Sequence, residues 1–197
     1  LILLDTSGSM LDNTIVNIIR RRNMRDERKR TAPKWTRAVA TVDWLSAKFP
    51  NSSEYQIYTF STDTKTAIPN TRGKWLKVSN KLQLDQGIKN LKNMVPENGT
   101  DLEQAFNSIN QLRPLPDNIF LITDGLPTQG SKATRGATIS GEQRLKLFER
   151  AVKALPKGFP VNIILSPMEG DPLAATLFWR LSQLTGGSFM SPSEDWP

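Results

Sequence analysis

The chain has 197 residues, 38% of them hydrophobic and 23% charged, and carries a formal net charge of +7; this composition is typical of one globular domain, and the charge favours acidic partners or anionic surfaces. It contains no cysteine and no histidine, which excludes disulfides, Cys/His zinc sites and catalysis by a histidine or cysteine side chain. No apolar run approaches the ~20 residues that a membrane-spanning helix needs.

The chain begins with an apolar run that is followed directly by turn-forming residues. Residues 1–4 predict a short strand buried on both faces, as in a parallel sheet. Asp5, Ser7 and Ser9 come next, and open α/β sheets bind ligands in loops at the carboxyl ends of their strands. Carboxylate and hydroxyl oxygens suit Mg²⁺, Mn²⁺ or Ca²⁺ rather than Zn²⁺. Taken alone, this stretch is equally consistent with an ordinary capped turn.

The next segment is strongly basic. We expect a helix that starts near Ile15 and continues into residues 20–30, which hold seven basic and two acidic side chains. Three interpretations stay open: a solvated helix face, docking of an acidic partner through Arg20, Arg21 and Arg22, or contact with nucleic acid or an anionic membrane. Nucleic acid is disfavoured, because no aromatic side chain that could stack on bases lies within the basic run.

Strands and helices then alternate to the end of the chain. The expected helices cover residues 34–49, 82–94, 102–112, 142–155 and 172–184, the expected strands cover residues 55–60, 75–78, 118–123, 161–165 and 188–190, and residues 126–140 are expected to form a long loop. This order predicts a single α/β domain over residues 1–197, with a doubly wound, mostly parallel sheet flanked by helices.

Two further polar positions are expected at the same edge of that sheet. Thr100 precedes a predicted helix, and Asp124 follows a buried strand. Together with Asp5, Ser7 and Ser9 they would supply two carboxylates and three hydroxyls, which can form an octahedral oxygen site with room for water. Neutral hydroxyls compensate little of a divalent charge. We therefore expect the metal to take a further anionic ligand, such as an aspartate or glutamate of a partner protein.

Three motifs in this order resemble a von Willebrand factor type A domain of the bacterial type: Asp5-x-Ser7-x-Ser9, Gly99-Thr100-Asp101-Leu102 and Thr123-Asp124-Gly125. The resemblance covers nearly the whole chain and implies the Rossmann-like fold of that family. It also implies a metal-ion-dependent adhesion site that holds Mg²⁺ or Mn²⁺, with Ca²⁺ as a further candidate, and ligands at the five positions named above. The function it implies is a non-enzymatic binding module in a larger assembly, either with an ATPase or on a cell envelope.

The sequence departs from the family pattern in two places. Residues 11–33 read as a basic insertion beside the metal loop, because the helix that normally follows that loop is expected only from Lys34. The family normally ends with a helix after its last strand, whereas this chain ends with residues 191–197. Because the chain starts inside a strand, we expect it to be a segment of a longer protein.

A different class of function remains as the alternative. Phosphatases of the haloacid dehalogenase type also place an aspartate, here Asp5, at the end of a first buried strand. Their pattern requires a second aspartate two residues later as general acid, and this chain has Ser7 there. A hydroxyl of ordinary acidity cannot replace a carboxylic acid in that role, so the binding module is the favoured interpretation.

Overall fold

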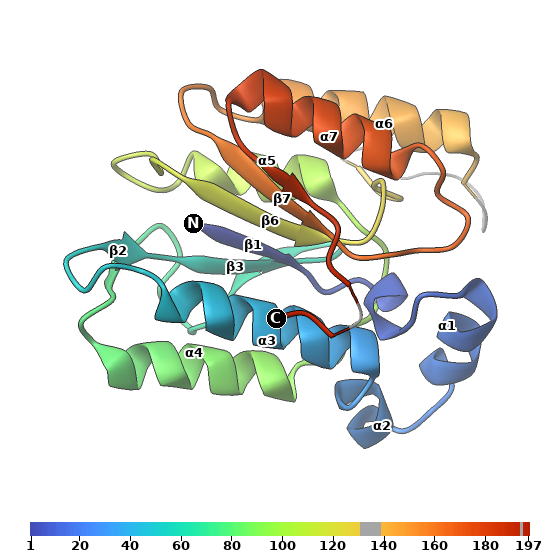
Figure 1. Ribbon diagram of the computed structural model, residues 1–197, viewed down its shortest axis with the longest axis horizontal. Helices are drawn as coiled ribbons and strands as arrows, with labels where there is room; N and C mark the ends of the chain where they lie inside the picture. Colours follow the sequence, from blue (N-terminus) through green and yellow to red (C-terminus); the bar gives the residue numbers. More distant parts are fainter. Residues whose placement is uncertain (131–138, 194) are drawn as a thin grey trace.

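The computed structural model describes residues 1–130, 139–193 and 195–197. Among them, a six-stranded sheet with the strand order β4-β3-β1-β6-β7-β8 runs through the middle of the molecule (Figure 1). Its strands are β1 (Ile2–Asp5), β3 (Ile57–Phe60), β4 (Thr64–Thr66), β6 (Ile119–Thr123), β7 (Val161–Leu165) and β8 (Phe189–Met190). All neighbouring pairs are parallel except β3 and β4. The predicted mostly parallel α/β sheet is therefore confirmed.

Helices cover both faces of this sheet (Figure 1). On one face lie α3 (Pro33–Ala47) and α4 (Lys81–Asn93), and on the other lie α5 (Leu102–Ile109), α6 (Gly141–Ala154) and α7 (Ala174–Thr185). A separate two-stranded ribbon pairs β2 (Glu54–Tyr55) with β5 (Leu76–Lys77). The sequence did not predict β4, which lies in a stretch rich in turn residues.

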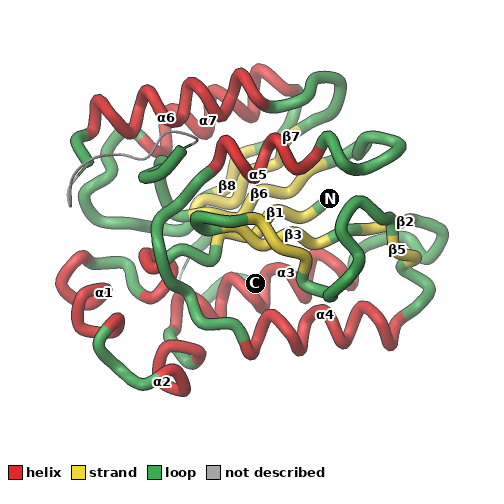
Figure 2. The backbone as a smooth tube through the Cα atoms, turned by 180° about the vertical axis from the view of Figure 1, so that it is seen from behind, coloured by secondary structure: helices red, strands yellow, loops and turns green. Residues whose placement is uncertain are grey.

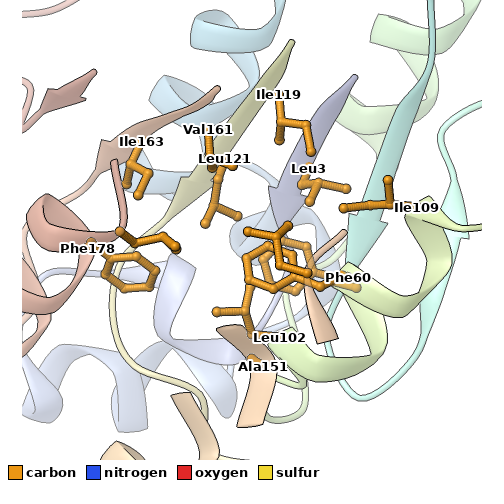
Figure 3. Packing of buried hydrophobic residues seen from close by; sticks show 14 of the residues in the cluster. Leu3, Phe60, Leu102, Ile109, Ile119, Leu121, Ala151, Val161, Ile163 and Phe178 are labelled. Carbon is orange, nitrogen blue, oxygen red and sulfur yellow. The ribbon is translucent and has the colours of Figure 1, made fainter. Parts of the chain in front are cut away.

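The residues of β1 alternate between two hydrophobic cores. Leu3 joins Phe60 and Phe178 in the core beneath α5, α6 and α7, which Figure 3 shows from close by. Ile2 and Leu4 pack into the core that α3 and α4 cover. The strand is buried along its full length, as the unbroken apolar run predicts. The loop that follows it is therefore anchored to a well-packed strand.

The basic segment differs from the single helix that the sequence predicts. A 3₁₀ turn, η1 (Gly8–Leu11), is followed by two short helices, α1 (Ile15–Arg22) and α2 (Asp26–Arg30). The backbone leaves the helical region between them, where Arg25 is extended. Each helix has basic residues in its last turn, and α2 also has two acidic residues in its first turn, an arrangement that complements two separate helix dipoles. Figures 1 and 2 place α1 and α2 at the end of the sheet where β1 ends.

The chain end packs on α3. After β8, none of the described residues of the tail is helical, and the Trp196 ring packs edge-on against Trp44 with 5.4 Å between the ring centroids. Much of the predicted loop over residues 126–140 lies outside the described residues. Among the helices that the structure describes, none has the length and apolar character required to cross a bilayer.

Candidate metal site at the carboxyl edge of the sheet

Asp5, the last residue of β1, is held by hydrogen bonds at both carboxylate oxygens. The Ser7 amide donates to Oδ1 at 2.8 Å, and the Thr123 hydroxyl donates to Oδ2 at 2.7 Å. The side chain is completely buried. Because its donors come from the first loop and from the end of β6, the carboxylate has one fixed orientation at the edge of the sheet.

Two hydroxyls and a second carboxylate continue from this point. The η1 turn brings Ser7 Oγ and Ser9 Oγ to within 3.0 Å of each other, and Ser9 Oγ donates to Asp124 Oδ1 at 2.9 Å. Adjacent oxygen ligands of an octahedral Mg²⁺, at bond lengths of ~2.1 Å, lie ~3.0 Å apart. The hydroxyl pair therefore has the spacing that such an ion requires.

The second loop is attached to the other two. The Gly8 amide donates to the Asn98 carbonyl at 3.0 Å, and the Thr128 and Gln129 amides both donate to the Thr100 carbonyl at 2.9 Å. The Thr100 amide donates to Thr128 Oγ1. Thr100 is buried, and its hydroxyl has no hydrogen-bond partner among the described residues. Because no hydrogen bond to those residues occupies it, this hydroxyl is free to act as a third neutral ligand.

Gly99 permits the close approach of the second and third loops. A Cβ atom at this position would lie 2.8 Å from Thr128 Oγ1 and 2.7 Å from Gln129 Cγ, shorter than real Cβ contacts. Any larger residue would push these groups away from Thr100. The predicted motif around Thr100 therefore has a steric reason for its glycine.

Burial and the neighbouring Asp124 carboxylate raise the pKa of Asp5 to about 7. Hydrogen bonds from Ser7 and Thr123 act in the opposite direction but are weaker. A buried pair of carboxylates favours a bound cation, because the cation stabilises their ionised forms. No group of three or more acidic side chains suited to a metal occurs among the described residues, so neutral hydroxyls would have to complete the ligand set here.

Lys34 is a site residue that the sequence analysis missed. It lies in the first turn of α3, is only 3% exposed, and places its Nζ 2.6 Å from Asp124 Oδ2. The same nitrogen donates to the backbone carbonyls of Asp12 at 3.0 Å and Ser9 at 3.2 Å. One signal could have revealed it: a lysine in the first turn of a helix opposes the helix dipole, so another contact must compensate for it.

The three arginines predicted to bind a partner have different environments. Arg21 is half-buried and pairs with Asp12 at 2.8 Å. Arg22 is exposed, and its guanidinium lies over the metal loop, where a Cβ atom on Gly8 would be 2.8 Å from Arg22 Nη2. Arg20 is also exposed. Successive helix residues are 100° apart around the helix axis, so these three side chains leave α1 in different directions, and their role in partner binding stays a prediction.

Comparison with known proteins identifies the family and the fold. The sequence model of the von Willebrand factor type A domain matches residues 1–126. A comparison with curated proteins gives no significant match. Among solved structures, the chain is similar to a von Willebrand factor type A protein from Catenulispora acidiphila, with 13% identity and a TM-score of 0.66, over 98% of this chain and 38% of that one.

Two further solved structures share the fold. BatB from Bacteroides thetaiotaomicron is 17% identical, with a TM-score of 0.57 over 98% of this chain and 88% of that one. The PilB minor pilin from Streptococcus sanguinis is 16% identical, with a TM-score of 0.60 over 98% and 57% respectively. The chain thus spans less than two thirds of the Catenulispora and Streptococcus proteins. At these identities the similarity concerns the fold alone.

Proposed function

The chain belongs to the von Willebrand factor type A family, and on that premise we propose that it is a metal-dependent protein-binding module. Domains of this family are commonly metal-dependent protein-interaction modules. The observation that carries the proposal is the Ser7–Ser9 hydroxyl pair, 3.0 Å apart, between the buried carboxylates Asp5 and Asp124. In this function the domain captures a partner and carries out no reaction.

The proposed metal ligands are Asp5, Ser7, Ser9, Thr100 and Asp124. All are oxygen donors, which suits Mg²⁺ or Mn²⁺, with Ca²⁺ as a further candidate. A cation bound there would offer a coordination position to a carboxylate. Asp5 already accepts hydrogen bonds at both of its oxygens, an arrangement that favours a fixed ligand over the attacking nucleophile of the phosphatase alternative.

The surface beside the site supports capture of an acidic partner. An open groove of about 680 Å³ starts at Asn98 and Gly99 of the second loop and continues past Arg22, Lys29 and Ile15 of the insertion. Within the described part of the chain, the Arg22 guanidinium makes no hydrogen bond or ion pair. It is therefore the arginine we assign to the partner's carboxylate, in place of the full set Arg20 to Arg22.

Apolar side chains extend this surface. On α1, Ile15, Val16 and Ile19 are 46%, 74% and 56% exposed. Ile15 and Arg22 line the same groove, and an apolar and a cationic side chain together would suit a partner segment in which an aspartate or glutamate is flanked by hydrophobic residues.

Peptide selection tests this function directly. Random peptides captured by the immobilised domain in Mn²⁺ and eluted with EDTA should share an aspartate or glutamate. Asp124→Ala should enrich none, whereas Thr6→Val should behave as the native chain, because the Thr6 hydroxyl donates to the Phe60 carbonyl. Enrichment that is unchanged by EDTA or by Asp124→Ala would refute the proposal.

A further inference from the structure

The surroundings of Lys34 stabilise a buried positive charge next to the candidate metal site. Its side chain is buried, and its ammonium nitrogen contacts three oxygens, Asp124 Oδ2, the Asp12 carbonyl and the Ser9 carbonyl, at 2.6, 3.0 and 3.2 Å. These acceptors match the three protons of an ammonium group. Buried charges persist in proteins when they are paired and hydrogen-bonded, and Lys34 meets both conditions.

Lys34 and the first loop contact Asp124 at different atoms. Asp124 uses Oδ2 for Lys34 and Oδ1 for the Ser9 hydroxyl. The ammonium and the Ser9 hydroxyl therefore lie on different oxygens of one carboxylate. Lys34 can stay in place when a cation enters, and a single carboxylate then lies between two positive charges.

The local charge follows from these contacts. Asp5, Asp124 and Lys34 sum to −1 when all three are ionised. In the absence of a divalent cation, Lys34 is the cation that balances the buried Asp124. In its presence, the ammonium repels the second positive charge, and repulsion between charges is stronger among largely buried groups such as Lys34, Asp5 and Asp124 than in bulk water.

We propose that Lys34 is a built-in counter-charge of this site, which stabilises the metal-free protein and weakens the binding of the divalent cation. This inference rests on the proposed metal site. Its consequence is that the site fills only when the cation is abundant. With a divalent cation bound, the two carboxylates balance the charge of the metal, and Lys34 leaves the site with a net charge of +1. This positive charge favours an anionic ligand from the partner.

The test compares Lys34→Met with Lys146→Met in calorimetric titrations with Mn²⁺. Lys146 is exposed and pairs with Glu142 on α6, so its variant removes the same charge away from the site. Lys34→Met should bind Mn²⁺ about tenfold more tightly or more, since one neighbouring charge changes the binding of a proton roughly ten- to a thousandfold. Lys146→Met should bind Mn²⁺ as the native protein does.

Thermal unfolding in EDTA supplies the second measurement. Lys34→Met should lower the melting temperature by about 6 °C or more, because Asp124 loses its ion pair with Lys34. Saturating Mn²⁺ should remove that difference, and a variant that folds only with Mn²⁺ would support the proposal equally. Lys34→Arg, which keeps the charge, should bind Mn²⁺ with native affinity.

The outcomes separate the two proposals. Equal or weaker Mn²⁺ binding by Lys34→Met, or tenfold tighter binding by Lys34→Arg, overturns the role of Lys34 and leaves the metal site intact. No Mn²⁺ binding by either the native chain or Lys34→Met overturns the metal site and this inference with it.

Discussion

The Thr123 hydroxyl donates a 2.7 Å hydrogen bond to Asp5 Oδ2, which joins the carboxyl ends of β6 and β1 across 118 positions of sequence. Both residues are buried, at 1% and 0% exposure. The bond fixes the Asp5 carboxylate and stabilises its charged form. It therefore links the stability of the sheet to the geometry of the candidate metal site.

Thr123→Val should lower the free energy of unfolding by about 1–3 kcal/mol, because a buried carboxylate oxygen loses its donor. Urea unfolding in EDTA measures this change. Thr64→Val is the matched control, since the Thr64 hydroxyl is buried on β4 and has no hydrogen-bond partner among the described residues. Its variant should be neutral or slightly more stable. Equal losses in both variants would show that the Thr123–Asp5 bond contributes nothing specific.

The raised pKa of Asp5 predicts how stability depends on pH without a divalent cation. The pKa of this carboxyl group has its ordinary value of 3.8 in the unfolded chain. It is about 7 in the folded chain, where burial and Asp124 oppose the charged form. Between these values the folded state holds one proton more than the unfolded state, so stability falls as pH rises from about 4 to 7. Lys34, paired with Asp124, is the neighbouring cation.

Urea unfolding in EDTA at several pH values checks this slope. Asp5→Asn should flatten the decline, because an amide does not titrate. Saturating Mg²⁺ should also flatten it by holding the carboxylate ionised. A native protein whose stability rises between pH 4 and 7 in EDTA would contradict the prediction.

The sequence predicts the sheet and the metal loops because their signals are local. The apolar run before Asp5 predicts a buried strand, and the polar loop after such a strand lies at the carboxyl edge of the sheet. Asp124 follows from the same reasoning, because it comes after a second buried strand, whereas the role of Thr100 is implied by the resemblance of its motif to the family pattern. The structure confirms the fold and brings these side chains to one edge, while their role as metal ligands stays a prediction.

Other features depend on contacts that no local pattern contains. Lys34 reads as an ordinary helix residue, because its partner Asp124 lies 90 positions further along the chain. The break between α1 and α2 falls among residues that all tolerate a helix, so periodicity gave no signal of it. The different surroundings of Arg21 and Arg22 likewise depend on where Asp12 and Gly8 lie.

Single arginine variants should separate the roles that the basic segment combines. Arg22→Ser should weaken the binding of an acidic peptide selected in Mn²⁺ by about two- to tenfold at low salt, and less at high salt, because screening reduces the attraction. Arg20→Ser should change the affinity less, since Arg20 lies on another side of α1. Fluorescence anisotropy at two salt concentrations measures both. Equal effects of Arg20→Ser and Arg22→Ser would support a diffuse charge effect instead.

Arg21→Ser tests the structural role of the third arginine. Loss of the 2.8 Å pair with Asp12 should loosen α1, because this bond joins the helix to the residue that follows η1. Hydrogen exchange should quicken in α1 (Ile15–Arg22), while the global free energy of unfolding falls by less than about 1 kcal/mol, as for other partly exposed ion pairs. Unchanged exchange in α1 would contradict this assignment.

The third loop is also held by a second, partly buried ion pair. Asp171 Oδ2 accepts from the Leu126 amide at 2.6 Å and from Arg144 Nη2 at 2.7 Å, and the same Nη2 donates to the Leu126 carbonyl. Arg144 on α6 and Asp171 before α7 thus both hydrogen-bond to the backbone of Leu126, two positions after Asp124. The pair holds the Asp124 loop against the helices on that face of the sheet.

Asp171→Asn should lower the free energy of unfolding by about 1–3 kcal/mol, because Arg144 and the Leu126 amide lose a charged hydrogen-bond partner in a partly buried position. It should also weaken Mn²⁺ binding, since Asp124 is then less firmly placed.

Combining Asp171→Asn with Arg144→Met should recover part of the stability, because the unpaired charge is gone. The double variant should still bind Mn²⁺ weakly, because the loop that carries Asp124 is still released. Urea unfolding and Mn²⁺ calorimetry on the three variants form a double-mutant cycle. Strictly additive losses would show that the two side chains act independently of each other.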